Sequence, residues 1–447
     1  MKITGQKWAV LGMGKSGDAA ARLLLSRGAE VSLWDGRIEE LTLQKNWKEH
    51  QGIAQIACGA HFPEGDFDGV VLSPGISLEH PSAVWARGKA DSVIGEIELA
   101  YHYWPGKIIA VTGTNGKSTT TELVNKVLQN GGVQSVACGN IGLPWSTVVD
   151  DATNHSVAVV EVSSFQLEGI QSFRPDVAIY LNLTPDHLDR YSDMKSYGKA
   201  KERIFNNQSP NDFAVVKKEL NLSLLRADTT HFSAECSLGD ADYTWHEGWI
   251  CRGADKIIHS GTTRLIGPHN AENIMATLAA TQFLGVDQSI AVAALKDYKP
   301  LPHRMERVAS WQSCVFINDS KATNPDAMLR ALEGVETPAC LIAGGKNKGF
   351  DFRPLRETVA TRCALVILIG EAAAEMESAW GAFVLCQRAE SIMQAVEMAV
   401  KPENPFRSVL LSPGCASFDM YKNFEDRGEQ FKKAVLSTIN KKQGELK

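Results

Sequence analysis

The feature that most constrains this chain is a glycine-rich turn at residues 111–120, which read Val-Thr-Gly-Thr-Asn-Gly-Lys-Ser-Thr-Thr. An apolar run precedes the turn, and a helix-like stretch follows it. Gly113 and Gly116 let the backbone approach an anion, toward which the N-terminus of the helix points its N–H groups. Lys117 adds a positive charge, and Ser118 offers a hydroxyl to Mg²⁺. The segment therefore predicts a phosphate-binding loop in a chain that uses a nucleoside triphosphate.

This loop departs from the usual phosphate-binding pattern at one position. The common form carries a further glycine five residues before the position of Gly116, and this chain has Val111 there. The loop is a shortened Thr-Gly-Thr-Asn-Gly-Lys-Ser form, which is rarer and more specific. A strand-to-helix turn that contains Gly-Lys-Ser without binding phosphate is the alternative. The order of strand, turn and helix argues against it.

The length of the chain requires more than one core. At about 100–200 residues per domain, 447 residues correspond to two to four domains, and we expect three. A hydrophobic content of 44% and a charged content of 22% are ordinary for a soluble globular protein. The net charge of −6, without a basic run, argues against a nucleic-acid partner. Phosphate binding must then depend on the residues of the loop and not on the net charge of the protein.

The expected fold is α/β throughout. Residues 1–99 form a Rossmann-like N-terminal domain. Residues 100–300 form a central P-loop ATPase domain, whose parallel sheet carries a small antiparallel sheet built from pieces between Thr229 and Ile266, such as 243–245 and 263–266. After a proline-containing linker at 298–302, residues 301–447 form a C-terminal Rossmann-like α/β domain with a third parallel sheet.

The N-terminal domain opens with a βαβ pattern. An apolar strand at 7–11 leads into Gly12-Met13-Gly14-Lys15-Ser16-Gly17, and a second strand ends at Asp35. These glycines fit the dinucleotide fingerprint, and Asp35 lies near the place where an acid binds a ribose hydroxyl. The same geometry holds any diphosphate-linked nucleotide. The motif therefore leaves two ligands open, a nicotinamide or flavin cofactor and a UDP-sugar.

The cysteines and the N-terminus indicate a cytoplasmic protein. Nine cysteines are scattered without a Cys-x-x-Cys pair or a Cys/His cluster, which suits reduced thiols. The N-terminus has no long apolar segment, and the strongest apolar run, 364–369, is far shorter than the roughly 20 residues that span a bilayer. We therefore expect neither export nor a membrane partner.

Two side chains at strand ends are candidate metal ligands. Glu161 ends an apolar strand after the phosphate loop, and a carboxylate there is placed to hold Mg²⁺, with a surface glutamate as the alternative. The next strand leads into a proline turn that exposes Asp186 and His187 at the same sheet edge. His187 can bind metal or orient phosphate, and a purely structural histidine is the alternative.

Several blocks of sequence in a fixed order resemble those of the Mur ligases of peptidoglycan synthesis. They are T-G-T-N-G-K-S-T at 112–119, E-V-S-S-F-Q-L at 161–167, N-L-T-P-D-H-L-D-R at 182–190, L-P-H-R at 301–304 and N-D-S-K-A-T-N at 318–324. The glycine turn at 12 and the segments 411–419 and 422–428 extend the resemblance over nearly the whole chain. Among these ligases, the chain most resembles the kind that adds D-glutamate.

The resemblance implies an ATP-dependent ligase that joins D-glutamate to UDP-N-acetylmuramoyl-L-alanine through an acyl phosphate and a tetrahedral intermediate. Such an enzyme makes peptidoglycan precursors and so serves cell-wall formation, cell shape and cell division. The resemblance implies ATP and two Mg²⁺ sites as cofactors, and a monomer with small-molecule substrates. The three domains would bind the UDP substrate, ATP and the amino acid, in that order.

The resemblance also implies the residues of each site. Those matched to the UDP substrate are Lys15, Ser16, Asp35, Gly36, Gly75 and Asn140. Those matched to ATP are Gly113, Thr114, Asn115, Gly116, Lys117, Ser118, Thr119, Asn270, Asn273, Arg304, Asp319 and Lys321. Those matched to D-glutamate are Thr323, Lys348, Ser417 and Phe424. Lys117 would hold the β and γ phosphate oxygens. Ser118 and Glu161 would hold one Mg²⁺, and His187 would help to hold the second.

Lys201 aligns with a lysine that the family carries as a carbamate. An ammonium group cannot ligate Mg²⁺, whereas addition of CO₂ turns the amine into an anionic oxygen donor. The resemblance therefore implies that carbamylated Lys201 is a ligand of the second Mg²⁺ and a catalytic residue beside Lys117 and His187. Without the resemblance, Lys201 would be read as a solvated helix lysine.

The match at Lys348 lacks one flanking residue of the family pattern, and Asn270 has a second possible role. The family pattern has an acidic residue two places before Lys348, and this chain has Lys346 there. Lys348 and Ser417 still supply the cationic and hydroxyl donors that the two carboxylates of glutamate need. Asn270 can also cap the helix that we expect from Ala271 to Leu284.

Three other functions are weighed against this one. A folylpolyglutamate synthase or another Mur ligase would share the chemistry, but the UDP-type first domain and the blocks at 161–167 and 318–324 favour the D-glutamate enzyme. An NAD-dependent oxidoreductase would use Gly12 to Asp35 and leave the loop at 113–118 without a role. A scaffold protein switched by nucleotide would show no phosphate release stimulated by substrate.

Overall fold

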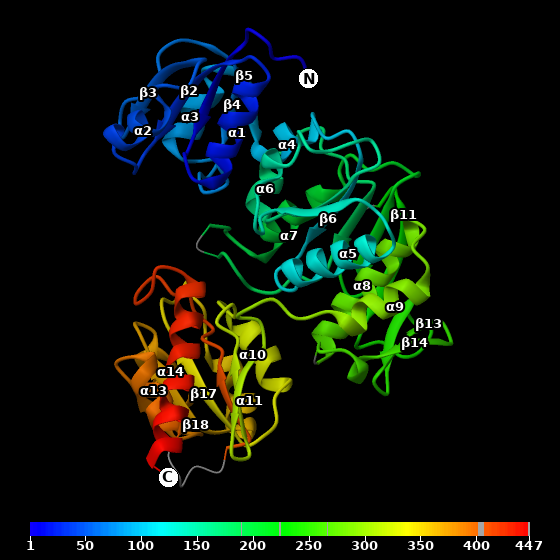
Figure 1. The fold of residues 1–447 in the computed structure, drawn as a ribbon, viewed down its shortest axis with the longest axis vertical. Coiled ribbons are helices and arrows are strands. Elements are labelled where there is room, and N and C mark those ends of the chain that lie inside the picture. Colours follow the sequence, from blue (N-terminus) through cyan, green and yellow to red (C-terminus); the bar gives the residue numbers. More distant parts are fainter. Residues whose placement is uncertain (189, 223–224, 266, 401–405, 446–447) are drawn as a thin grey trace. The chain divides into compact units, whose positions relative to one another are not determined.

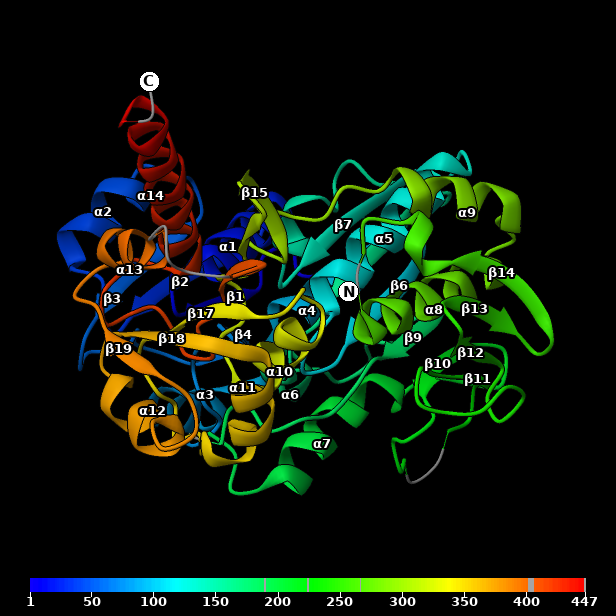
Figure 2. The same cartoon turned by 90° about the horizontal axis from the view of Figure 1, so that it is seen from below.

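The computed structural model describes residues 1–188, 190–222, 225–265, 267–400 and 406–445. The chain divides into two compact units. Unit 1 comprises Met1–Leu183, Lys195–His259 and Glu272–Asp297. Unit 2 comprises Thr184–Met194, Ser260–Ala271 and Tyr298–Lys447. Figures 1 and 2 show the helices and strands of both units.

The first sheet of unit 1 is parallel and has the order β3-β2-β1-β4-β5. Its strands are β1 (Lys7–Leu11), β2 (Glu30–Asp35), β3 (Ile53–Cys58), β4 (Phe67–Leu72) and β5 (Ala90–Gly95), and its helices are α1 (Lys15–Ser26), α2 (Glu40–Trp47) and α3 (Pro81–Arg87). Buried clusters cover both faces, which explains the continuous apolar sequence of β1. A Cβ on Gly69 of β4 would lie 2.3 Å from the ring of Trp8, so a side chain there would clash. The expected Rossmann-like first domain is confirmed.

The second sheet of unit 1 has the order β14-β13-β12-β11-β10-β9-β6-β8-β7. Its strands are β6 (Lys107–Thr112), β7 (Ser135–Gly139), β8 (Val157–Glu161), β9 (Val177–Tyr180), β10 (Phe213–Lys217), β11 (Asp228–Ser233), β12 (Tyr243–His246), β13 (Trp249–Arg252) and β14 (Asp255–His259). The helices of this stretch of sequence are α4 (Glu96–Tyr101), α5 (Lys117–Asn130), η1 (Trp145–Thr147), α6 (Ser164–Glu168), α7 (Met194–Glu202), η2 (Arg203–Phe205), η3 (Ser260–Thr262), α8 (Pro268–Phe283) and α9 (Gln288–Asp297).

The expected antiparallel addition continues the parallel sheet as its edge. β12, β13 and β14 are antiparallel, whereas β11 is parallel to both of its neighbours. The strand expected at 263–265 is wrong, because η3 turns the chain after β14. The Thr263 hydroxyl donates to Ser260 O at 2.8 Å, a local bond that competes with strand pairing. Ile266 of the same prediction lies outside the described residues.

Unit 2 contains a third sheet with the order β15-β16-β20-β17-β18-β19. Its strands are β15 (Glu306–Trp311), β16 (Cys314–Asn318), β17 (Ala339–Gly344), β18 (Cys363–Ile369), β19 (Cys386–Arg388) and β20 (Ser408–Leu411). Its helices are α10 (Pro325–Glu333), η4 (Arg353–Leu355), α11 (Arg356–Arg362), α12 (Ala373–Trp380), α13 (Ile392–Ala399) and α14 (Phe424–Glu445). One buried cluster packs α10, α11 and α12 on one face, and another packs α13 and α14 on the other.

The third sheet is mixed, whereas we expected it to be parallel. The edge strand β15 is antiparallel to β16, and the other pairs are parallel. Only Gln312 and Ser313 connect β15 to β16, and Gln312 has a φ of 52°. A connection this short can join only antiparallel strands. β15 was not predicted, because its sequence Glu-Arg-Val-Ala-Ser-Trp contains no apolar run.

The sequence predicted reduced cysteines and no membrane-spanning segment. All nine cysteines lie within the described residues and are free thiols. Burial raises the pKa of the Cys363 thiol to about 12, which keeps it protonated and unreactive. In the part of the chain that the structure describes, no helix is both long and apolar enough to cross a bilayer.

Helix α4 connects the two sheets of unit 1 and is fixed by buried hydrogen bonds. Just before it, Gly95 N donates to Gly169 O at 2.9 Å. Within it, Glu98 is fully buried and accepts bonds from the N–H groups of Gln171, Ser172 and Phe173 at 2.8–2.9 Å, and from the Ser172 hydroxyl. Burial alone would raise the pKa of Glu98, but the bonds from His102, Ser172 and the backbone outweigh it and lower the pKa to about 2.

We predict that Glu98→Gln lowers the free energy of unfolding at pH 7 by about 3 kcal/mol. A carboxyl group with a depressed pKa contributes its full stabilisation above its ordinary pKa of 4.5, and this contribution is lost as the pH falls toward 2. The difference between the two proteins in urea denaturation should therefore shrink between pH 5 and pH 2. The exposed Glu79→Gln is the control. An equal difference at pH 3 and pH 7 would contradict the prediction.

Candidate active site

The predicted phosphate loop lies between β6 and α5, as expected. Gly113 and Gly116 have positive φ angles of 152° and 83°, which L side chains rarely adopt. A Cβ on Gly116 would also lie 2.4 Å from Asn273 Oδ1. The loop therefore needs glycine at both positions. It leads directly into the first turn of α5, whose free N–H groups favour an anion.

Asn182 holds this loop by three hydrogen bonds. Its carbonyl oxygen accepts from Thr114 N at 3.0 Å, and its Oδ1 accepts from Asn115 N at 2.9 Å. Its Nδ2 donates to Asn115 O at 3.1 Å. Asn182 begins the sequence block at 182–190, from which no role for it was predicted. The only available signal was its place just after a strand that neighbours the loop.

Two lysine side chains meet at one carbonyl oxygen of the loop. Lys117 Nζ donates to Gly113 O at 2.9 Å and to Thr114 O at 2.7 Å. Lys201 Nζ, from α7, donates to the same Gly113 O at 2.8 Å. The Lys201 side chain is buried, with 1% of the residue exposed, and its nitrogen lies 4.6 Å from the centre of the Tyr197 ring. Lys201 therefore contacts the predicted phosphate loop and is not a solvated helix lysine.

Glu161 is the last residue of β8 and lies opposite Val111 of β6. It is 2% exposed. Its Oε1 accepts a hydrogen bond from Asn140 Nδ2 at 2.8 Å, and the backbone N–H of Asn140 donates to Glu161 O at 2.8 Å. Its Oε2 is buried and has no hydrogen-bond partner in the described part of the chain. One oxygen is thus oriented by the protein, and the other is available to a ligand.

The residues around Glu161 fit a magnesium ion. A buried carboxylate oxygen without a partner is costly unless a cation or donor meets it. Carboxylate and hydroxyl oxygens are ligands that Mg²⁺ prefers, and Ser118 supplies a buried hydroxyl in the first turn of α5. Within the described ranges, no three His, Cys, Asp or Glu side chains gather.

The predicted asparagines of α8 differ in their surroundings. Asn273 Oδ1 accepts a hydrogen bond from the Thr120 hydroxyl of α5 at 3.2 Å and lies against Gly116. Asn270 Nδ2 lies 3.1 Å from His269 Nε2. Because α8 begins at Pro268, earlier than expected, Asn270 lies inside the first helical turn and not at the N-cap. The prediction that Asn270 caps this helix is therefore wrong.

At the first sheet, the Asp35 carboxylate accepts hydrogen bonds from the backbone of the loops after β1 and β2. Its Oδ2 accepts from Met13 N at 2.7 Å, and its Oδ1 accepts from Arg37 N and Ile38 N at 2.8 and 2.9 Å. Lys15 and Ser16 begin α1, Gly36 follows β2, and Gly75 follows β4. All four lie after carboxyl ends of strands, where open parallel sheets bind ligands.

In unit 2, the Asp186 carboxylate lies close to three polar side chains. Its Oδ2 accepts from Asn324 Nδ2 at 3.2 Å and lies 3.7 Å from His187 Nε2. Its Oδ1 lies 3.8 Å from Lys348 Nζ. His187 has a φ of 55°, which is uncommon for a residue with a side chain. The predicted metal ligand His187 and the predicted amino-acid ligand Lys348 therefore share one carboxylate, a role for Asp186 that the sequence analysis missed.

The loop after β16 carries the predicted residues Asp319, Lys321 and Thr323. Asp319 Oδ1 accepts from Met305 N, and its Oδ2 accepts from the Ser412 hydroxyl, both at 3.1 Å. Burial raises the pKa of Asp319 to about 7 despite these bonds. Lys321 N donates to His303 O at 3.1 Å, and Lys321 Nζ lies 4.0 Å from the centre of the Phe424 ring. This loop thus contacts both the turn at 303–305 and the start of α14.

The predicted site residues are divided between the units. Unit 1 holds Lys15, Ser16, Asp35, Gly36, Gly75, Gly113, Thr114, Asn115, Gly116, Lys117, Ser118, Thr119, Asn140, Glu161, Lys201 and Asn273. Unit 2 holds His187, Asn270, Arg304, Asp319, Lys321, Thr323, Lys348, Ser417 and Phe424. Their ligand roles stay predictions.

Three family models match consecutive segments of the chain. They are described as "Mur ligase MurD-like, N-terminal domain" at residues 6–95, "Mur ligase middle domain" at 111–281 and "Mur ligase, glutamate ligase domain" at 303–415. The UDP-N-acetylmuramoylalanine--D-glutamate ligase of Geobacter sp. (strain M21) is 39% identical over 445 residues, which cover 97% of this chain and 98% of that protein. The protein of the same name from Desulfitobacterium hafniense (strain Y51) is 39% identical over 456 residues, with the same coverage.

Two solved structures share the fold. The UDP-N-acetylmuramate-alanine ligase MurC of Thermotoga maritima has a TM-score of 0.63 and 18% identity, and the match covers 97% of this chain and 100% of that chain. The MurF ligase of Thermotoga maritima in complex with ADP has a TM-score of 0.59 and 17% identity, with coverage of 99% and 96%. These likenesses support the α/β architecture with three domains.

We predict that Asn140→Ala weakens the binding of a divalent cation together with nucleotide. The substitution removes the donor that orients Glu161 Oε1, and loss of such a bond typically weakens metal affinity at least about 10-fold. Electron paramagnetic resonance of Mn²⁺ with ADP should show this loss, while ADP affinity without metal stays unchanged. Asn211→Ala, at an exposed position, is the matched control. Equal Mn²⁺ affinity in the two variants would contradict the prediction.

Proposed function

The chain belongs to the Mur ligase family, and from this premise we propose that it is the ATP-dependent ligase that joins D-glutamate to UDP-N-acetylmuramoyl-L-alanine in peptidoglycan precursor synthesis. Relatives named for this activity match 97% of the chain at 39% identity. The structural observation that carries the proposal is the buried, unpartnered Oε2 of Glu161 at the end of the strand beside the phosphate loop. A buried carboxylate oxygen without a partner among the described residues is costly unless a cation or donor meets it, and Glu161 lies opposite Val111, just before the predicted phosphate loop.

The reaction activates a carboxylate and then forms an amide bond. The carboxylate oxygen of UDP-N-acetylmuramoyl-L-alanine attacks the γ-phosphorus of ATP, which gives an acyl phosphate and ADP. The amine of D-glutamate then attacks the acyl carbon and loses a proton. The tetrahedral intermediate expels inorganic phosphate. Because charge builds up on phosphoryl oxygens in the first step, positioning and cationic groups supply most of the catalysis.

Each domain has one part of this work. Residues 1–99 would bind the UDP substrate, residues 100–300 would bind ATP, and residues 301–447 would bind D-glutamate. In the central domain, the N–H groups of the loop and Lys117 would hold the β and γ phosphate oxygens. Ser118 and Glu161 would hold one Mg²⁺, which supplies positive charge to the transferring phosphoryl group when bound.

Lys201 is proposed to carry a carbamate and, with His187, to hold a second Mg²⁺. Its burial supports this, because an ammonium group pays a desolvation cost that an uncharged amine does not. Its position supports it as well, because Lys201 Nζ and Lys117 Nζ donate to the same carbonyl oxygen, where two positive charges repel each other. Reaction of the neutral amine with CO₂ converts the group to an anion and ends this repulsion.

The proposed activity predicts a specific substrate requirement. With ATP, Mg²⁺ and UDP-N-acetylmuramoyl-L-alanine, the purified protein should release phosphate with D-glutamate and not with L-glutamate or other amino acids. Lys117→Met should abolish the release, because it removes the charge beside the phosphate oxygens. A protein that left ATP intact with every amino acid would overturn the proposal. Such a result would favour a nucleotide-switched scaffold.

The carbamate has a test of its own. Lys201→Ala should lose activity, and millimolar acetate or propionate should restore part of it, because a small carboxylate can replace the carbamate oxygens. With ¹³C-labelled bicarbonate, a carbamate carbon resonance should be present in the wild type and absent in the variant. Lys199→Ala, at an exposed position of the same helix, is the matched control and should keep full activity. Lys201→Ala with full activity, or without rescue and without a missing resonance, would contradict carbamylation.

A further inference from the structure

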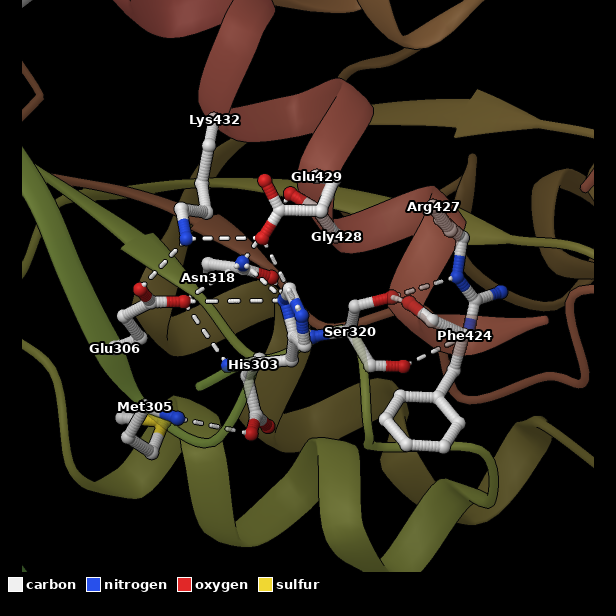
Figure 3. A network of polar contacts seen from close by, with 11 residues as sticks. His303, Met305, Glu306, Asn318, Ser320, Phe424, Arg427, Gly428, Glu429 and Lys432 are labelled. Carbon is white, nitrogen blue, oxygen red and sulfur yellow. Dashed lines mark hydrogen bonds and ion pairs between the residues drawn. The ribbon is translucent and has the colours of Figure 1, made fainter. Parts of the chain in front are cut away.

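A fully buried arginine lies among the loops of unit 2 and has no part in the proposed chemistry. Arg427 is the fourth residue of α14 and has no exposed surface. Its Nε donates to Ser320 Oγ at 3.0 Å, and one of its terminal nitrogens donates to Ser320 O at 2.8 Å. The other donates to Cys415 O at 3.1 Å and to Ala416 O at 3.4 Å. Figure 3 shows the guanidinium beside Ser320.

These acceptors belong to two loops at the carboxyl edge of the third sheet. Ser320 follows β16, and it lies between Asp319 and Lys321. Cys415 and Ala416 follow β20, which pairs with β16, and they come directly before Ser417. One planar group therefore fixes the backbone beside predicted ligands of ATP and of D-glutamate.

The loop after β17 is linked to Arg427 through Ala416. Lys346, after β17, exchanges two backbone hydrogen bonds with Ala416, at 2.9 and 3.1 Å. A Cβ on Gly345 would lie 3.2 Å from the guanidinium and 2.3 Å from Ala416 O, so the loop packs tightly against both. Lys348 lies two residues further along. The guanidinium thus connects the ends of three adjacent strands, β16, β20 and β17.

The start of α14 is held at this place by further contacts. The Ser320 hydroxyl donates to Phe424 O at 2.8 Å, so Ser320 contacts the helix both through Arg427 and directly. On the other side of Arg427, Asn318 Nδ2 donates to Gly428 O at 3.3 Å and lies 2.9 Å from His303 Nδ1. Figure 3 shows His303 and Asn318 next to Gly428. The helix is therefore fixed on both sides, and the guanidinium keeps one position.

The type of side chain at 427 also matters. Burial lowers the pKa of Arg427 to about 10, so the group stays charged at neutral pH. Five N–H donors in a rigid fork can serve carbonyl oxygens from different loops at once, whereas a lysine ammonium has a single centre. A hydrocarbon side chain would remove the guanidinium donors from the carbonyl oxygens of Ser320 and Cys415.

We propose that Arg427 is a positioning residue of the amino-acid site, which holds the loops after β16, β17 and β20 in the arrangement that receives D-glutamate. The inference deepens the proposed function and rests on it for the identity of the ligand. Arg427 acts through the loop backbones and does not touch the substrate.

The test compares Arg427→Lys and Arg427→Met with Arg407→Met, which changes an exposed arginine of the same unit. The KM for D-glutamate should rise at least about 10-fold in both Arg427 variants. The KM for UDP-N-acetylmuramoyl-L-alanine should stay within about twofold, because its predicted ligands belong to unit 1. Hydrogen exchange should be faster at the amides of 344–346 and 414–417 in the Arg427 variants than in the control.

A merely structural role would give a different result. It would lower kcat in proportion to the unfolded fraction and leave every KM and the exchange of the loops unchanged, and that outcome would overturn the proposal. Should Arg427→Met fail to fold, Ser320→Ala removes only the Nε acceptor and the bond to Phe424 O, and it should raise the KM for D-glutamate about threefold or more. A wild type without D-glutamate-dependent phosphate release would overturn the proposed function, while hydrogen exchange would still decide the role of Arg427 in holding the loops.

Discussion

The parallel pairing of β6 with β8 is the constraint on which the central site depends. It places Glu161 opposite Val111, one residue before the backbone turns into the phosphate loop. Val162 N donates to Val111 O and the Thr112 hydroxyl donates to Val162 O, each at 2.9 Å, so the register continues past the strand ends. A slip of one residue would turn the Glu161 side chain to the other face of the sheet. The carboxylate and the loop can therefore act together only in this register.

Buried charges in this protein fall into two kinds. Glu98 and Arg427 are saturated with hydrogen bonds to backbone groups, and they hold segments that are distant in sequence. Glu161 differs, because only one of its oxygens is satisfied. Burial is costly for all three groups, and hydrogen bonds repay that cost only for the first two. Among the described residues, Glu96 also has one oxygen without a partner, so the place of Glu161 opposite Val111, and not the missing bond alone, favours a ligand there.

The sequence predicted the parts of the structure that depend on local signals. The phosphate loop, the first βαβ unit and the burial of strands such as β1 follow from glycine spacing and apolar runs, and the structure has them. The antiparallel strand β15 was missed because its charged and small residues form no apolar run. Arg427 was not singled out because its partner Ser320 is 107 residues away. The roles of Asn182 and Asp186 were missed for the same reason, since both depend on contacts between separate strand ends.

The departure at Lys346 has a physical explanation in the loop after β17. The backbone of residue 346 is held by its two bonds to Ala416, which any amino acid except proline can make, and its side chain is exposed. The neighbouring Asn347 fixes the turn instead, because its Oδ1 accepts from Phe350 N at 2.8 Å and its Nδ2 donates to Phe350 O at 3.1 Å. The position of Lys348 thus depends on Asn347 and on the backbone, so a lysine can replace the expected acid at 346 without moving it.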